Sequence, residues 1–240
     1  MKSLQLLPPL LVAMSSGLFA QSPLQIDWVS NIGNQPIITS DGSAATLSEF
    51  SFELGGFANG FVPTSSNIDQ WVANWQVFDA ITEGDSDSND IFNTSTASFA
   101  GTGFLNVDQT SLSEDSNGID TFGPGQQAYI FVRNMDDILN PDTEFLLFTS
   151  QEGVDFEFPE VSGQQQQPNL LFNVGEVDTV LFGSVNPDPT DPNNVIVGDG
   201  FFTDTSTDFL LRTQSLIPEP STSLLFLGAG LSLLVRRRKS

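Results

Sequence analysis

The sequence contains neither cysteine nor histidine, and only 7 of its 240 residues are lysine or arginine. Without cysteine the chain has no disulfide, no thiolate metal site and no cysteine nucleophile. Without histidine it has no Ser-His-Asp triad, and it lacks the usual general base and the usual ligand of zinc and copper. Any catalysis would therefore have to use carboxylates, the single tyrosine, an arginine or a hard metal ion held by oxygen ligands.

Basic residues are almost absent from the body of the chain. Between Lys2 and Arg236 the only ones are Arg133 and Arg212, whereas the whole chain has 30 aspartates and glutamates. Nucleic acids bind through lysine and arginine that neutralise phosphates, so a nucleic-acid partner is excluded. Two explanations of the acidity stay open: solubility in salty surroundings, where charges are screened, and a requirement for divalent cations.

The N-terminus has the layout of a secretory signal peptide. Met1-Lys2 is a short basic start, residues 4–12 are mostly apolar, and small residues precede Ala20. This order is typical of an exported protein, so residues 1–20 are predicted to be removed by cleavage after Ala20. The alternative, a buried core helix, is disfavoured because Pro8-Pro9 would break it.

The C-terminus combines three features in order. A Pro-Glu-Pro tripeptide is followed by an uncharged, mostly apolar segment and then by a basic cluster: Pro218, Glu219, Pro220; residues 221–235; Arg236, Arg237, Arg238 and Lys239. The pattern predicts a transmembrane helix at 221–235 with its basic end in the cytoplasm. Such a helix would span only about 22 Å of a hydrocarbon core of about 30 Å, although long basic side chains can make up part of the difference.

This tail resembles the PEP-CTERM sorting domain, which is found in Gram-negative bacteria that make exopolysaccharide. The resemblance implies processing by an exosortase that recognises Pro218, Glu219 and Pro220, with Arg236 to Lys239 as the stop signal. It also implies a final location in the cell envelope, at the cell surface or outside the cell. The alternative is an ordinary tail anchor. Members share the tail and little else, so the resemblance carries an address and no activity.

The body of the chain is predicted to be all-β, a sandwich or jelly-roll-like antiparallel domain over residues 21–212, followed by a spacer at 213–217 and the sorting signal at 218–240. Apolar residues alternate at 50–54 and at Trp71, Ala73 and Trp75, and short apolar runs at 129–132 and 145–148 lie between turn residues. Period-two alternation and turn-bounded runs indicate strands. A short helix is expected near residues 66–71.

Three acidic loops are candidates for calcium binding, because calcium takes six to eight oxygen ligands and acid-rich loops supply them. The first offers Asp85, Asp87, Asn89 and Asp90; the others span residues 114–120 and 186–194. None has the spacing of an EF-hand. The alternative is a set of solvated polar turns, which the same residue types favour. No cofactor other than calcium is predicted.

Three functions are compatible with these features. The first, and the prediction adopted, is a non-enzymatic structural or interaction protein outside the cell. The second is a module that binds exopolysaccharide by stacking sugar rings on Trp28, Trp71 or Trp75, although core packing is the expected role of tryptophans in apolar stretches. The third is a glycosidase that uses two carboxylates, such as Glu49 with Glu53 or Glu157 with Glu160. An acidic sequence always offers such pairs, so their presence does not favour an enzyme.

Overall fold

The structure is a computed structural model that describes most of the chain between the two predicted sorting segments. The described residues are 22–30, 36–83, 90–94, 98–151, 156–161, 170–186, 195–198, 200–201 and 209–216. Strands predominate among them, and helix in this part is confined to short segments: η1 (Ile68–Gln70), α1 (Trp71–Asn74) and η2 (Val174–Glu176). The all-β prediction is therefore confirmed. The predicted signal peptide, the helix at 221–235 and most of the sorting signal lie outside the described residues.

The first sheet has four strands in the order β11 (Leu170–Asn173), β1 (Leu24–Val29), β6 (Ser98–Leu105) and β5 (Ile91–Asn93). β1 and β6 alternate strictly between buried and half-buried residues for most of their length. This alternation is typical of a sheet that covers a core with one face. β11 runs parallel to β1, whereas the other pairs of this sheet are antiparallel.

The central sheet has seven strands. Six lie in the order β15 (Gly200–Phe201), β12 (Thr179–Phe182), β9 (Glu144–Thr149), β8 (Tyr129–Arg133), β3 (Ser51–Phe57) and β4 (Trp75–Ile81), and β17 (Gln214–Ser215) pairs with β9. The apolar runs at 129–132 and 145–148 form β8 and β9 as predicted. All five residues of β8 are buried, which is why its sequence is apolar without alternation.

Two smaller sheets complete the fold. One contains β14 (Ile196–Val197), β13 (Ser184–Asn186), β16 (Leu210–Arg212) and β2 (Ile37–Ile38); the other pairs β10 (Glu157–Phe158) with β7 (Gln126–Gln127). The described strand pairs are antiparallel, as predicted, except for two parallel pairs, β16 with β2 and β1 with β11. Each parallel pair joins strands far apart in the sequence, and no local pattern predicts such a pairing.

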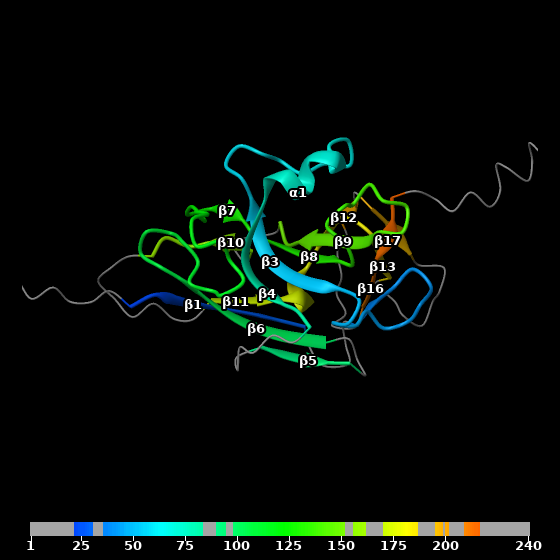
Figure 1. Cartoon of the computed structure of the whole chain (residues 1–240), viewed down its shortest axis with the longest axis horizontal. Coiled ribbons are helices and arrows are strands. Elements are labelled where there is room, and N and C mark those ends of the chain that lie inside the picture. Colours follow the sequence, from blue (N-terminus) through cyan, green and yellow to red (C-terminus); the bar gives the residue numbers. More distant parts are fainter. Residues whose placement is uncertain are drawn as a thin grey trace, which may run out of the picture.

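The main core lies between the first sheet and the central sheet, which face each other as two layers (Figure 1). The first sheet contributes Ile26, Trp28 and Phe172, and the central sheet contributes Phe52 and Phe148 among others, all without exposed surface. Phenylalanine rings touch throughout, as with Phe78 and Phe122, whose centroids lie 5.3 Å apart. The abundance of phenylalanine therefore serves core packing.

A second apolar cluster covers the opposite face of the central sheet. Trp71 in α1 is fully buried there against Phe57 and Phe145, at centroid distances of 6.2 Å each. α1 lies on the far side of the central sheet from β5 and β6 (Figure 1). Residues 71–74 are helical, so the expected strand alternation from Trp71 to Trp75 is corrected: Trp71 anchors the helical turn and Trp75 begins β4.

The single tyrosine belongs to this second cluster and provides a pH test of the fold. Tyr129 is 8% exposed, and burial raises the pKa of its hydroxyl to about 12. An unfolded tyrosine titrates near pH ~10. Between pH ~10 and ~12 the unfolded chain loses this proton before the folded chain does, so the Tyr129 contribution to stability is complete below pH ~10 and is lost through this window.

We therefore expect tyrosinate absorbance in the native protein to rise with a midpoint near pH ~12, or together with alkaline unfolding. Because the chain has one tyrosine, the signal has a single source. Tyr129→Phe should lack this absorbance change. A midpoint near pH ~10 in a protein that is still folded by circular dichroism would contradict the buried position of Tyr129.

Candidate functional site

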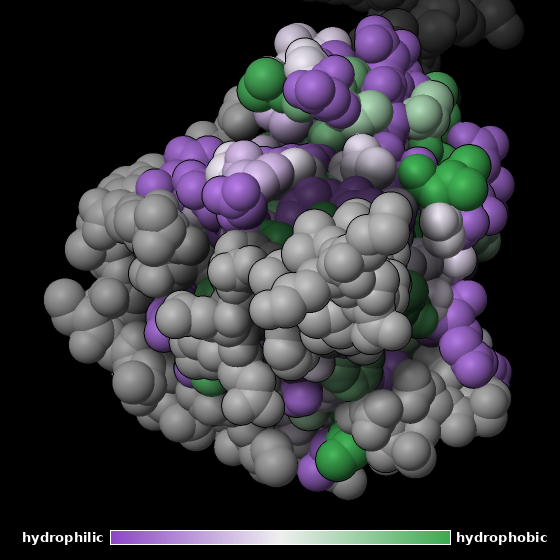
Figure 2. Space-filling model, turned by 90° about the vertical axis from the view of Figure 1, so that its left-hand side faces the viewer, coloured by the Kyte–Doolittle hydropathy of each residue, from purple (hydrophilic) through white to green (hydrophobic). Residues whose placement is uncertain are grey.

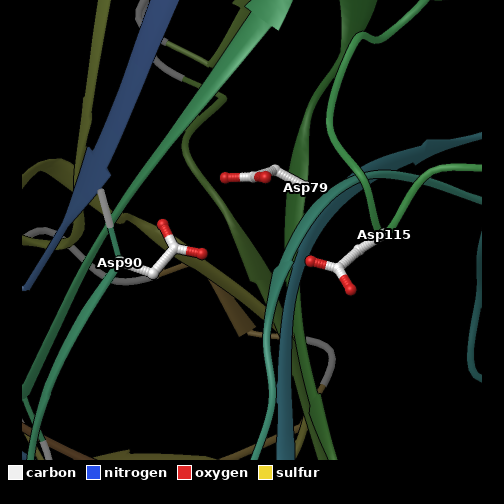
Figure 3. A group of neighbouring side chains, drawn as sticks. All are labelled: Asp79, Asp90 and Asp115. Carbon is white, nitrogen blue, oxygen red and sulfur yellow. The ribbon is translucent and has the colours of Figure 1, made fainter. Parts of the chain in front are cut away.

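Three carboxylates from separate segments meet beside the main core. One oxygen each of Asp79, Asp90 and Asp115 lies within 4.8 Å of the others, and Figure 3 shows the carboxyl groups around a common space. Asp90 is the one described residue of the predicted calcium set; Asp85, Asp87 and Asn89 lie outside the described residues. Asp115 belongs to the second acidic loop. The structure thus brings together members of two loops that were predicted as separate candidate sites.

A β-bulge in β4 places Asp79 in this cluster. Leu54 and Gly55 are consecutive in β3, but their partners in β4, Asp79 and Val77, are separated by Phe78. Phe78 is therefore the extra residue of a bulge, a feature that redirects side chains. Both Phe78 and Asp79 face β6, where Gly103 leaves room: a Cβ there would lie 2.5 Å from the Phe78 ring.

Asp79 is held by neutral hydrogen-bond donors. It is 2% exposed, accepts a 2.6 Å hydrogen bond from Trp28 Nε1 through Oδ2, and accepts one of 2.6 Å from Ser113 Oγ through Oδ1. The backbone N–H of Thr102 in β6 donates to Asp90 Oδ1 at 3.2 Å. These bonds fix two carboxylates while Asp115 is exposed on its loop.

The arrangement suits a hard cation chemically, because clustered carboxylates repel one another and calcium prefers oxygen ligands. The loop that carries Asp115 also contains a local turn, in which Asn117 Oδ1 accepts from the backbone N–H groups of Ile119 and Asp120. A solvated polar turn accounts for that loop without an ion. The sequence predicted calcium at Asp85, Asp87, Asn89 and Asp90, and of these Asp90, the one described residue, belongs to the cluster. Calcium binding here stays a prediction.

If calcium binds at the cluster, it should raise the thermal unfolding temperature by roughly 5–10 °C when its concentration is about 100 times the dissociation constant. Asp115→Asn should reduce this rise, because Asp115 is exposed and can be changed without disturbing the core. Asp142→Asn, at an exposed acid outside the cluster, is the control. A rise of the same size in both variants, or no rise in the unchanged protein at constant ionic strength, would contradict the prediction.

The three tryptophans are buried or half-buried in the domain. Trp28 and Trp71 have no exposed surface, and the half-buried Trp75 donates from Nε1 to Glu53 Oε2 at 2.7 Å. Core packing was expected of Trp71 and Trp75, and it is confirmed for Trp71. Trp28 is buried as well, so neither Trp28 nor Trp71 can stack on a sugar in this structure. Glu53, considered above for glycoside hydrolysis, is engaged by Arg133 at 3.0 Å.

The described surface shows no large apolar patch. Figure 2 shows one face, on which the described apolar residues (green) stand in small separate groups among hydrophilic residues (purple). The most exposed large apolar side chains of the described residues are Ile119, Val62 and Ile91, and they belong to different segments. Scattered apolar residues of this kind are normal on a soluble surface and do not define a binding patch.

The folded domain extends to Leu216, beyond the predicted boundary at residue 212. Thr213 is fully buried, β17 pairs with β9, and Leu216 packs against the second apolar cluster. Residues 213–216 are therefore part of the fold, and the predicted spacer at 213–217 is corrected to this extent. No sequence pattern predicted this strand, because Thr213 to Ser215 are polar and the segment is too short to show alternation.

Immediately after this last strand lies the sorting signal. Residues 216–239 match the PEP-CTERM protein-sorting motif, which confirms the resemblance inferred from the tail. The chain therefore carries an exosortase sorting signal, which implies processing by an exosortase and export to the cell envelope or surface. No curated protein and no solved structure matches the chain. Within the described part of the chain, no helix has the length and apolar character needed to cross a membrane.

Proposed function

We propose that this chain is an exported protein of the Gram-negative cell surface or extracellular matrix, with a structural or interaction role and no enzymatic activity. The sorting motif at residues 216–239 is the observation that carries the proposal. The N-terminal segment through Ala20 begins export, the C-terminal signal holds the precursor at the membrane, and processing releases or attaches the β-domain. The domain itself, built as two facing sheets, acts as a stable acidic scaffold.

The acidic composition supports a place outside the cell. Arg133 and Arg212 are the only basic residues in the body of the chain, and the charge of Arg133 is neutralised by its buried ion pair with Glu53. A polyanionic coat keeps such a domain soluble and separate from anionic lipid head groups. Association with exopolysaccharide is compatible with this role, but it would have to use groups other than Trp28 and Trp71, which are buried.

The proposal predicts that sorting depends on the Pro-Glu-Pro tripeptide. In an exosortase-containing host, the combined change Pro218→Ala, Glu219→Ala and Pro220→Ala should abolish processing and leave the chain intact through Ser240 in membranes. A matched control exists in the chain, because Pro187-Asp188-Pro189 has the same proline–acid–proline pattern. Its replacement by three alanines should leave processing unchanged.

Mass spectrometry of envelope and medium fractions measures both variants. Processing of the variant changed at 218–220 at the rate of the unchanged protein would contradict the proposal. In a host without exosortase, we expect that the unchanged protein keeps its C-terminal signal. Its N-terminal segment should still be removed normally.

A further inference from the structure

The last strand of the domain and the sorting tripeptide are almost contiguous. Leu216 packs against the second apolar cluster, and Ile217 is the single residue between it and Pro218. The folded domain and the motif therefore have almost no spacer between them, which raises the question of how an enzyme reaches the motif.

The C-terminal segment of the domain is held by contacts from three directions. The Thr213 backbone N–H donates to Ile38 O at 2.9 Å, and Thr213 Oγ1 donates to Glu144 Oε2 at 2.6 Å. The same carboxylate accepts from the Ser40 backbone N–H at 2.9 Å and from Ser40 Oγ. Glu144 thus joins the start of β9 to the loop after β2 and to the residue before β17.

β17 itself completes one edge of β9. Gln214 and Ser215 pair with Phe145 and Glu144, whereas β12 pairs with the other end of β9, from Leu147 to Thr149. Ser215 Oγ adds a 2.9 Å hydrogen bond to Pro141 O. We use the term C-terminal clasp for residues 213–216 together with their partners Ile38, Glu144 and Pro141.

Processing breaks one peptide bond in or beside the motif. The acyl group of the domain passes to water or to an acceptor nucleophile such as an amine, and the amino group leaves with the C-terminal fragment. Proteins that recognise peptides commonly bind them as extended strands, through main-chain hydrogen bonds and pockets for alternate side chains, and we assume this mode for the exosortase. Gln214 and Ser215 end two residues before the Pro-Glu-Pro tripeptide, and they cannot pair with β9 and occupy an enzyme cleft at the same time.

We propose that docking of the C-terminal clasp competes with exosortase processing, so that the enzyme acts on chains in which residues 213–216 are released. This inference rests on the proposed function, because it concerns regulation of the same sorting signal. If the precursor can be processed only when this segment is released, its processing rate is proportional to the fraction of molecules in the released form. The clasp therefore sets the processing rate of the folded precursor.

The experiment measures conversion of the full-length precursor by pulse-chase in the exosortase-containing host. A flexible Gly-Ser linker of about six residues, inserted between Leu216 and Ile217, separates the motif from the clasp without changing the fold. It should speed processing about tenfold, with the cut at the same place in the motif. Glu144→Gln, which weakens the hold on Thr213 and Ser40, should speed processing severalfold, and Glu49→Gln at an exposed position is its control.

A linker variant that is processed at the same rate as the unchanged protein, or more slowly, would overturn the competition. The proposed function would then still stand, because both proteins would be processed. Failure of the unchanged protein and of the linker variant to be processed at all would instead refute exosortase sorting. The linker lies after the last described strand, so the test does not depend on a substitution that weakens the domain.

Discussion

Replacing Glu53 by alanine is expected to lower the free energy of unfolding by about 3–5 kcal/mol. Arg133 Nε and Nη2 donate to Glu53 at 3.0–3.1 Å, and both residues are at most 9% exposed. The substitution would leave the guanidinium buried without its partner and would also remove the acceptor of Trp75 Nε1. Arg133 Nη1 lies 2.9 Å from Asp136, but that carboxylate is exposed and the contact is not aligned as a hydrogen bond.

Chemical denaturation measures this effect, with Glu49→Ala as the control. Glu49 is exposed just before β3, so its replacement should change the free energy of unfolding by no more than about 0.5 kcal/mol. Replacing both members of the pair, Glu53→Met with Arg133→Met, should recover most of the loss, because a buried pair and apolar residues of similar volume are often close in stability. A cost below about 1 kcal/mol for Glu53→Ala would show that the pair is open to solvent.

Replacing Trp28 by alanine is expected to cost about 3–5 kcal/mol, because a fully buried indole is removed from between the two sheets. Its ring packs on Phe99 with centroids 5.0 Å apart, and it fills the space left by Gly101, where a Cβ would lie 2.3 Å from Nε1. Trp28→Phe should cost less, about 1–3 kcal/mol, chiefly because Asp79 Oδ2 loses the hydrogen bond from Trp28 Nε1.

Val62→Ala is the control for this series, since Val62 is 69% exposed and should change stability little. The order expected in urea denaturation is Trp28→Ala, then Trp28→Phe, then Val62→Ala. If Trp28→Phe is as stable as the unchanged protein, the hydrogen bond to Asp79 contributes nothing, and the buried carboxylate must be satisfied by other partners.

The strands that the sequence predicted well are those in the middle of the central sheet. Residues 129–132 and 145–148 are apolar because both faces of the sheet are covered, so their character is visible in any short window. Residues 50–54 were also correctly read, since Phe52 and Leu54 face the main core while Glu53 faces Arg133.

β6 was not predicted because glycine occupies core-facing positions within it. Gly101 and Gly103 lie where Trp28 and Phe78 approach the backbone, so the apolar side chains that fill these places belong to other strands. A half-buried strand is recognised by large apolar residues at every second position, and β6 has glycine at two of these positions. Close approach of this kind is a property of the tertiary structure.

The carboxylate cluster could be predicted only in part. The acidic loops were visible from composition, but Asp79 was missed because it is a single acid inside the apolar strand β4. A lone carboxylate in such a strand is the signal that could have drawn attention to it, since buried charge is uncommon without a partner. Its position depends on the bulge at Phe78, which no local sequence pattern announces.

Mass spectrometry of the protein recovered from the cell envelope and from the culture medium tests whether this chain is an exported precursor processed at its C-terminal sorting signal. We expect a chain that starts near Gln21 and ends near Pro218–Ser221, with or without an added group at the new C-terminus. An intact chain through Ser240, found only in membranes, would rule out this processing and would indicate a plain tail-anchored protein.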